Sequence, residues 1–157
     1  MISQFWVQNS EVILKLTTAV LLGMIIGLQR LFVNRAAGMK TYALVSLGAA
    51  SFVVISEMLS VKYIDVKGFD PSRIASQVVV GIGFLGAGSI IMRDNKTLGL
   101  TTAAGLWVTA SIGMACGFGF FDIAIITTVL VLFILTVVYR IEKPIKEIRT
   151  KSESDDS

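Results

Sequence analysis

The stretch RIASQVVVGIGFLGAGSIIMRDNKTLGLTTAAGLW, residues 73–107, decides the fold of this chain. From Ile74 to Met92 no residue carries a formal charge. A helix of about 20 apolar residues crosses the hydrocarbon core of a bilayer. The segment therefore predicts a membrane-spanning helix over 74–92.

Three glycines of this segment, Gly81, Gly83 and Gly86, match the pattern G-x-G-x-x-G that binds dinucleotides. That function requires a strand before the glycines, a soluble helix after them and an acidic residue about 20 positions further on. Here a long apolar run precedes them, and position 106 is Leu. Glycine in a membrane helix more often allows two backbones to approach closely, so helix packing is favoured over nucleotide binding.

One face of the predicted helix combines polar and small residues. At about 100° per residue, one arc of about 80° collects a charge, an amide and two glycines. Its members are Arg73, Gln77, Gly81, Phe84 and Gly88. Gly83 and Gly86 lie on another face, which predicts a central helix with protein neighbours on more than one side. The pattern leaves open whether 81–88 is a continuous helix or is locally unwound.

The composition is that of an integral membrane protein. Hydrophobic residues make up 54% of the 157 residues, charged residues 16%, and the mean hydropathy is +0.78. Because the apolar residues form long blocks, the net charge of +3 indicates topology and gives no reason to expect a nucleic-acid partner. A transition-metal centre is not expected without histidine, and Cys116, the single cysteine, excludes an intrachain disulfide.

We expect an all-α, polytopic membrane protein with about five transmembrane helices, at residues 12–28, 41–59, 74–92, 101–116 and 122–139. Lys15 lies near a helix end, where its ammonium group would snorkel to water. Arg30 falls in the first connection, and the Thr101 hydroxyl would cap the fourth helix. Asp70 would cap the third helix, with Pro71 in its first turn.

Small residues predict the helix contacts. Gly23 and Gly27 form a G-x-x-x-G pair in the first helix. In the fourth helix a ridge of small residues recurs every four positions, at Gly105, Thr109, Gly113 and Gly117. We expect the third and fourth helices to pair as a glycine-lined hairpin, and the last helix, which has no glycine, to lie at the periphery facing lipid.

Domain limits and orientation follow from the charges. Residues 1–140 form the predicted membrane domain, and 141–157 a basic and then acidic tail that is partly disordered. Most of the 14 Lys and Arg residues lie in the first connection, the third connection and the tail. The positive-inside rule then predicts an N-terminus outside and a C-terminus in the cytoplasm.

Several blocks, taken in order, resemble the N-terminal membrane domain of the MgtC/SapB family of bacterial inner-membrane proteins. They are GLQR (27–30), AGMKTYALVSLGA (37–49), RIASQVVVGIGFLGAGSII (73–91) and GLTTAAGLWVTASIGMACGFG (99–119). The chain departs from the family at Gln29, where Glu is usual, and at Lys40 and Tyr42, where Arg and His are common. The missing acid weakens any role for a Glu and Arg pair in the first block.

The resemblance implies a multi-pass protein of the bacterial inner membrane linked to growth at low magnesium and, in some pathogens, to virulence. One member of the family is associated with inhibition of the rotary ATP synthase, which is therefore an expected type of partner. Longer members carry a C-terminal domain resembling ACT modules, and this chain is expected to be a short form without it. Many members are described as magnesium transport proteins.

Three functions remain open. The first is a non-enzymatic regulator that acts through helix contacts with a membrane partner or a second copy. The second is an ion or small-solute pathway, associated with Mg²⁺, lined by Arg73, Gln77, Thr101 and Thr102. The third is a cytoplasmic surface that binds phosphate through Arg93, Lys96 and the start of the fourth helix, for which lipid head groups are the simpler partner.

Enzymatic function is the least expected class, because catalytic sets that need histidine are impossible and no close carboxylate pair lies in a predicted span. No cofactor and no metal ligands are predicted, and the lipid bilayer is an expected partner. The candidate functional or packing residues are Arg30, Gly38, Lys40, Thr41, Arg73, Gln77, Gly81, Gly83, Gly86, Gly88, Arg93, Thr101, Thr102 and Trp107.

Overall fold

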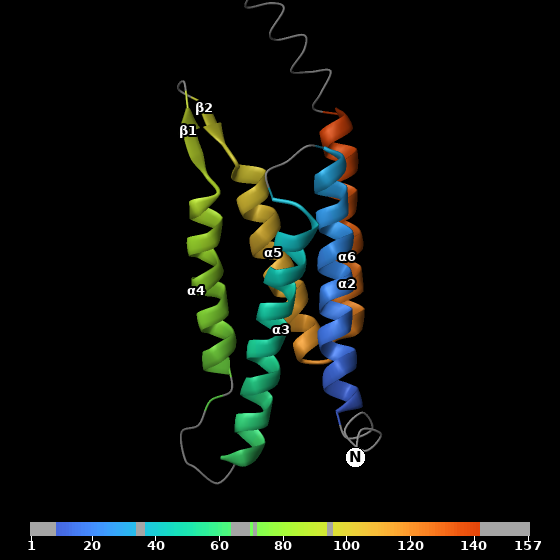
Figure 1. Ribbon diagram of the computed structural model, residues 1–157, viewed down its shortest axis with the longest axis vertical. Helices are drawn as coiled ribbons and strands as arrows, with labels where there is room; N and C mark the ends of the chain where they lie inside the picture. The colour runs from blue at the N-terminus through green and yellow to red at the C-terminus, as the bar shows by residue number, and fades with distance from the viewer. Residues whose placement is uncertain (1–8, 34–36, 64–69, 71, 94–95, 142–157) are drawn as a thin grey trace, which may run out of the picture.

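The protein is a bundle of antiparallel helices with one short β-hairpin (Figure 1). A computed structural model describes residues 9–33, 37–63, 70, 72–93 and 96–141. Its helices are α2 (Ser10–Phe32), α3 (Met39–Lys62), α4 (Ser72–Gly88), α5 (Leu100–Gly117) and α6 (Phe121–Phe133), and α6 continues into a π-helical turn, η1 (Ile134–Val138). The expected all-α, polytopic membrane fold is confirmed.

Within the described residues, four helical segments are long and apolar enough to cross a membrane: α2, α3, α5 and the continuous segment Phe121–Ile141. Helix α4 has 17 residues, at the lower limit of about 17–25 residues for a span. It is continuous from Ser72 to Gly88, which answers the question left open for its glycines.

The predicted end of the third helix is wrong by one turn. The helix stops at Gly88, and Ile91 and Met92 lie in strand β1 (Ile91–Arg93), which pairs antiparallel with β2 (Lys96–Leu98). Every described residue of the two strands is exposed, so burial does not drive their pairing. The apolar character of positions 91 and 92 made them resemble a continuation of the helix.

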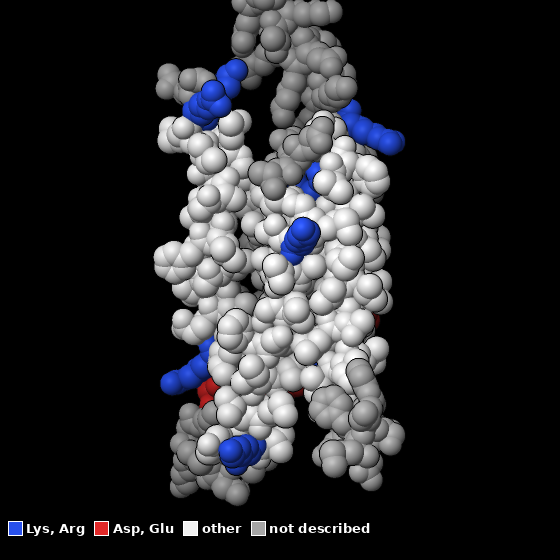
Figure 2. Space-filling model, viewed as in Figure 1, with Lys and Arg blue, Asp and Glu red and all other residues white. Residues whose placement is uncertain are grey.

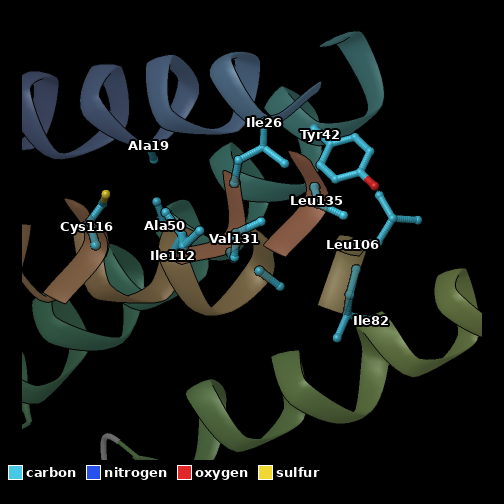
Figure 3. Close-up of a cluster of buried hydrophobic side chains, with 13 residues drawn as sticks. Ala19, Ile26, Tyr42, Ala50, Ile82, Leu106, Ile112, Cys116, Val131 and Leu135 are labelled. Atoms are coloured by element: carbon cyan, nitrogen blue, oxygen red, sulfur yellow. The ribbon is translucent and has the colours of Figure 1, made fainter. Parts of the chain in front are cut away.

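Helix α5 occupies the centre of the bundle and packs against α2, α3, α4 and α6. Its buried apolar side chains include Leu106 and Ile112, which meet residues of the other helices in one core (Figure 3). The prediction that the third helix is central is therefore wrong, because only Ile82 and Gly86 of α4 are buried. The expected peripheral position of the last helix is confirmed for α6, whose side chains are mostly exposed.

The small residues of α2 and α5 mark two contact faces, as expected, but both faces meet α3. A Cβ atom placed on Gly23 would lie 2.7 Å from the Tyr42 carbonyl oxygen of α3. A Cβ atom on Gly113 would overlap the Ser46 carbonyl oxygen of the same helix. Helix α3 therefore lies against both glycine faces at backbone distance, and side chains at these glycines would push the helices apart.

The predicted pairing of the third and fourth helices is present but has a single glycine contact. Gly86 of α4 is buried, and a Cβ atom placed there would lie 3.7 Å from the Ala103 side chain of α5. A Cβ atom on Gly81, Gly83 or Gly88 would meet nothing within 4 Å. Gly83 thus lies on the outer side of α4, whereas Gly81 lies on the side that faces α3.

Capping differs between α4 and α5. Asp70 accepts hydrogen bonds from the backbone N–H of Ser72 (2.9 Å) and from its hydroxyl (2.7 Å), as expected for a residue that caps α4; Pro71 lies outside the described residues. The Thr101 cap is wrong, because Gly99 precedes the helix with φ of 91° and no side chain caps it. A Cβ atom at Gly99 would overlap the Ser89 carbonyl oxygen, which only glycine avoids here.

The described acidic residues lie at one end of the bundle, whereas Lys and Arg lie at both, so the charged residues described at the other end, which we call the basic end, are all Lys or Arg. The first connection, the hairpin and the C-terminal end of the last helix lie at one end (Figure 1). The acidic residues that the structure describes all belong to the segments at the other end: Glu11, Glu57, Asp70 and Asp122. On the face shown in Figure 2 the surface between the ends is largely uncharged. The cytoplasmic side of the basic end stays a prediction of the positive-inside rule.

Candidate functional site

Arg30 is buried inside the bundle, so its predicted place in the first connection is wrong. Helix α2 continues through Leu31 and Phe32, which puts Arg30 in its last turn with 3% of its surface exposed. Its Nη2 atom donates a hydrogen bond of 3.0 Å to Oγ1 of Thr102, in the first turn of α5. A positive residue after an apolar block suggested the end of the span, but the helix runs on past it.

Tyr42, from a third helix, lies beside Arg30 and Thr102. It lies in the first turn of α3, and its side chain is fully buried. A Cβ atom placed on Gly105 would lie 2.6 Å from the Tyr42 hydroxyl, so this hydroxyl rests on the backbone of α5 one turn after Thr102. We call Arg30, Tyr42 and Thr102 the arginine cluster; it joins α2, α3 and α5.

The Tyr42 side chain interacts with the Arg30 guanidinium. Within the described residues, neither the Tyr42 hydroxyl nor Nε of Arg30 makes a hydrogen bond of good geometry, although both are buried. No described carboxylate forms a salt bridge with Arg30. Buried polar groups are almost always satisfied, so these atoms require an explanation.

Gln29 lies beside Arg30 in the sequence but bonds to a different helix. Its Nε2 donates a hydrogen bond of 3.1 Å to the Leu135 carbonyl oxygen, in the π-helical turn η1. Its Oε1 is buried without a partner among the described residues. An acid at this position would meet the Leu135 carbonyl, another acceptor, so the amide suits this contact better than a carboxylate would.

A long apolar groove separates α3 from α4. Its volume is about 940 Å³, and it is lined from α3 by Lys40 and Thr41 and from α4 by Arg73, Gln77 and Gly81 as well as by apolar side chains. The structure thus brings Arg73, Gln77 and Gly81 to one face, as predicted. Phe84 and Gly88, assigned to the same face, do not line the groove.

The predicted phosphate surface is not assembled as expected. Arg93 and Lys96 face each other across the hairpin register, and both are exposed. Thr101 is exposed at the start of α5, whereas Thr102 is buried against Arg30. The adjacent threonines therefore have different environments, which the sequence alone does not distinguish.

The remaining candidates lie at the surface or at a helix start. Gly38 precedes α3 in extended backbone, and a Cβ atom there would meet nothing within 4 Å. Trp107 of α5 is 49% exposed. Within the described ranges no group of three or more His, Cys, Asp or Glu side chains could hold a metal ion.

Comparison with known proteins finds one matching family and several similar proteins. The model of the MgtC family matches residues 16–144. YhiD of Escherichia coli (strain K12), described as a candidate magnesium transporter, is 41% identical over 135 residues, which cover 85% of this chain and 63% of YhiD. MgtC of Salmonella typhimurium (strain LT2) is 46% identical over 120 residues, 76% of this chain and 49% of MgtC. MgtC of Brucella abortus (strain 2308) is 44% identical over 117 residues, which cover 74% of this chain and 47% of that MgtC.

The chain therefore spans about half to two thirds of the length of these relatives. No solved structure matches it.

Proposed function

The chain belongs to the MgtC family, and from this premise we propose that it is a non-enzymatic regulator in the bacterial inner membrane. It acts under magnesium limitation or a related stress, through helix contacts with a membrane partner or with a second copy of itself. The names of its relatives support a multi-pass membrane protein of the MgtC type linked to magnesium.

The observation that carries this proposal is the glycine surface of α4. The glycine faces of α2 and α5 are each filled by α3, at distances where a Cβ atom would overlap the neighbour. On α4, Gly83 has open space instead; it lies on the side of the helix opposite Gly81, and this outer side, which also carries the exposed Val80, is the glycine surface of α4. Small residues in a membrane helix favour close helix association, and a further helix would use this surface as α3 uses the others.

Two kinds of partner fit this surface. A second copy would place the same surface of α4 opposite itself across a two-fold axis. A different membrane protein would supply an unrelated helix, and the family association with the rotary ATP synthase indicates one such protein. Either partner would contact the same residues of α4. A single crosslinking site on α4 therefore captures either one, and the mass of the product distinguishes a second copy from a different protein.

The test is cysteine crosslinking in native membranes, in a Cys116→Ser background that removes the single native thiol. Val80→Cys places a thiol on α4 one turn before Gly83, where Val80 is 59% exposed. Val129→Cys on α6, 58% exposed, is the matched control. We expect a crosslinked product from Val80→Cys, at twice the chain mass for a second copy or at a different mass for another partner, and none from Val129→Cys.

A further change makes the test specific to the glycine surface. Gly83→Leu, added to Val80→Cys, should abolish the product, because its side chain would hold a partner backbone away. Equal crosslinking from Val80→Cys and Val129→Cys, or a product that survives Gly83→Leu, would contradict helix contact through α4.

The groove between α3 and α4 favours one alternative, a component of ion or small-solute transport. Its described charged lining residues, Lys40 and Arg73, are both basic, so the groove suits anions better than Mg²⁺. Liposomes containing the purified protein would be assayed for flux of Mg²⁺ and of phosphate. Flux lost on Gly48→Leu, which would fill the groove, would support transport; no flux of either ion would remove it.

A further inference from the structure

The groove between α3 and α4 is open because small residues line it on both sides. Gly48 on α3 and Gly81 on α4 both line the groove, and a Cβ atom placed on either would meet nothing within 4 Å. Ala49 and Ala110, both buried, line it from α3 and α5. On the face shown in Figure 2, a hollow separates α4 from the rest of the bundle. The missing side chains therefore leave a space of about 940 Å³.

The groove has the length of the hydrocarbon of one leaflet. Along α3 its lining runs from Lys40 to Phe52, a length of about 18 Å at a rise of about 1.5 Å per residue. The hydrocarbon core of a bilayer is about 30 Å thick, so the acyl chains of one leaflet cover about half of it. Because Lys40 lies in the first turn of α3, the groove extends from the basic end towards the middle of the span.

The groove is too narrow for a partner helix. A volume of about 940 Å³ over a length of about 18 Å gives a mean cross-section of about 50 Å². A helix with its side chains is about 10–12 Å in diameter, which corresponds to about 80–110 Å². Water is a poor occupant because most of the lining is apolar, and an empty groove would forfeit van der Waals contacts. Flexible hydrocarbon chains fit this space best.

The charges at the two ends of the groove indicate the head group. Of the described lining residues, Lys40 and Arg73 carry a charge, and both are basic. Arg73 interacts electrostatically with Asp70, whereas Lys40 lies at the basic end, where the described charged residues are all Lys or Arg. The Lys40 ammonium group and the Thr41 hydroxyl are both exposed and can donate hydrogen bonds to phosphate oxygens. Anionic head groups are attracted to such a position.

We propose that the groove holds an acyl chain of an anionic phospholipid, with the lipid phosphate bound by Lys40 and Thr41. The lipid fills the space between α3 and α4, where α4 has little buried surface of its own. This site does not depend on the helix contact proposed above, because Gly83 lies on the side of α4 opposite Gly81. It also differs from the exposed phosphate surface that the sequence suggested, to which neither Lys40 nor Thr41 belongs.

The test uses phosphatidylglycerol that carries a photoactivatable diazirine in one acyl chain, added to the intact protein in a neutral detergent. After illumination, mass spectrometry identifies the labelled peptides. The yield is measured against increasing amounts of unlabelled phosphatidylglycerol or phosphatidylcholine with the same acyl chains. We expect label in residues 44–52 and 77–85 and little on α6. Phosphatidylglycerol should compete at about one fifth of the concentration of phosphatidylcholine, the effect of one basic residue beside anionic head groups.

Two matched variants locate the acyl chain. Gly81→Leu places a side chain in the groove, and Gly83→Leu places the same side chain on the outer side of the same helix. Both glycines have open space, so both variants should fold. The label in the groove should disappear in Gly81→Leu and remain in Gly83→Leu. Gly48→Leu, which fills the groove from α3, repeats the test independently.

A second pair locates the phosphate. Lys40→Gln should abolish the preference for phosphatidylglycerol over phosphatidylcholine, and Arg73→Gln, at the other end of the groove, should leave it unchanged. Loss of the preference in Arg73→Gln instead would overturn the proposal, because the phosphate would then lie at the wrong end.

Four other results would also overturn the proposal. They are even labelling of the groove and α6, equal competition by the two lipids, equal loss of label in Gly81→Leu and Gly83→Leu, and a groove without label, which a protein occupant would produce. Since Gly83→Leu removes the helix contact and Gly81→Leu removes the lipid, a failure of either proposal is distinguishable from a failure of the other.

Discussion

Nζ of Lys15 lies 2.7 Å from Oε2 of Glu57, and this ion pair joins α2 to α3 at the end of the bundle opposite the arginine cluster. Lys15 is 7% exposed and also lies 3.0 Å from Glu11, so the expectation that its ammonium group snorkels to water is wrong. The acid from α3 replaces the water that Lys15 would otherwise reach.

Glu57→Gln should destabilise the protein, because it removes the interhelical acid and leaves Lys15 buried. We expect a loss of about 1.5–3 kcal/mol in the free energy of unfolding, the range for hydrogen bonds to charged groups. Glu11→Gln is the control, since that carboxylate is 79% exposed, and its cost should stay below about 1 kcal/mol. Melting temperatures in detergent check both, and equal losses would contradict the dominance of Glu57.

Gly113→Ala should destabilise the bundle, because the added methyl group would overlap the Ser46 carbonyl oxygen and backbone cannot move aside as a side chain can. We expect a cost of about 1–3 kcal/mol or more. Gly83→Ala is the matched control on α4: its methyl group meets open space, and alanine favours helix by up to about 1 kcal/mol. A similar melting temperature for the two variants would argue against the packing of α5 on α3.

Gly99→Ala should distort the connection between the hairpin and α5. The backbone at Gly99 has φ of 91°, and a Cβ atom would overlap the Ser89 carbonyl oxygen. Strain of this type costs about 1–3 kcal/mol. Proteolysis of the hairpin in membranes should become faster in Gly99→Ala and remain unchanged in Gly88→Ala, whose methyl group has free space.

The first turn of α4 should lose protection in acid. Hydrogen bonds from the hydroxyl and backbone N–H of Ser72 lower the pKa of Asp70 below its ordinary value of 3.8. A lowered pKa in the folded state means that the stabilisation is present above the ordinary pKa and disappears as the pH falls through the lowered value.

We therefore expect the ratio of amide exchange rates between Asp70→Ala and the native chain, measured at Ser72 and Arg73, to be high near neutral pH and to approach one in acid. The ratio cancels the intrinsic pH dependence of exchange. A ratio that does not change with pH would show that the Asp70 carboxylate does not hold this turn.

The orientation in the membrane can be tested with single cysteines in the Cys116→Ser background. Thr97→Cys lies on β2 and Phe120→Cys precedes α6 at the opposite end. With the basic end in the cytoplasm, an impermeant maleimide should label Phe120→Cys in intact cells and Thr97→Cys only after the membrane is opened. The reverse pattern would invert the topology.

The sequence predicted the existence and approximate limits of every long helix, because an uncharged block of this length has few other stable states in a bilayer. It did not predict which helix is central. The glycine patterns of α4 and α5 are similar in the sequence. A Cβ atom on Gly113 would nevertheless overlap α3, whereas one on Gly83 would meet open space. That difference depends on which helices meet, which no local pattern records.

The arginine cluster was only partly predictable. Arg30 and Thr102 were both singled out, but for different reasons, and the hydrogen bond between them spans three helix connections. Tyr42 was noted only as a departure from the family pattern. The neighbouring Gly105 was an available signal, because a glycine beside a buried aromatic residue allows the ring to lie on the backbone.

The attachment of α4 has a mechanical consequence. Its buried residues, Ile82 and Gly86, lie one turn apart in its C-terminal half, and Val78 packs against the same core, so the helix is attached through a short stretch. Helix α4 can therefore tilt about this attachment while the core around α5 stays intact. Each tilt would widen the space beside α3 at one membrane surface and narrow it at the other.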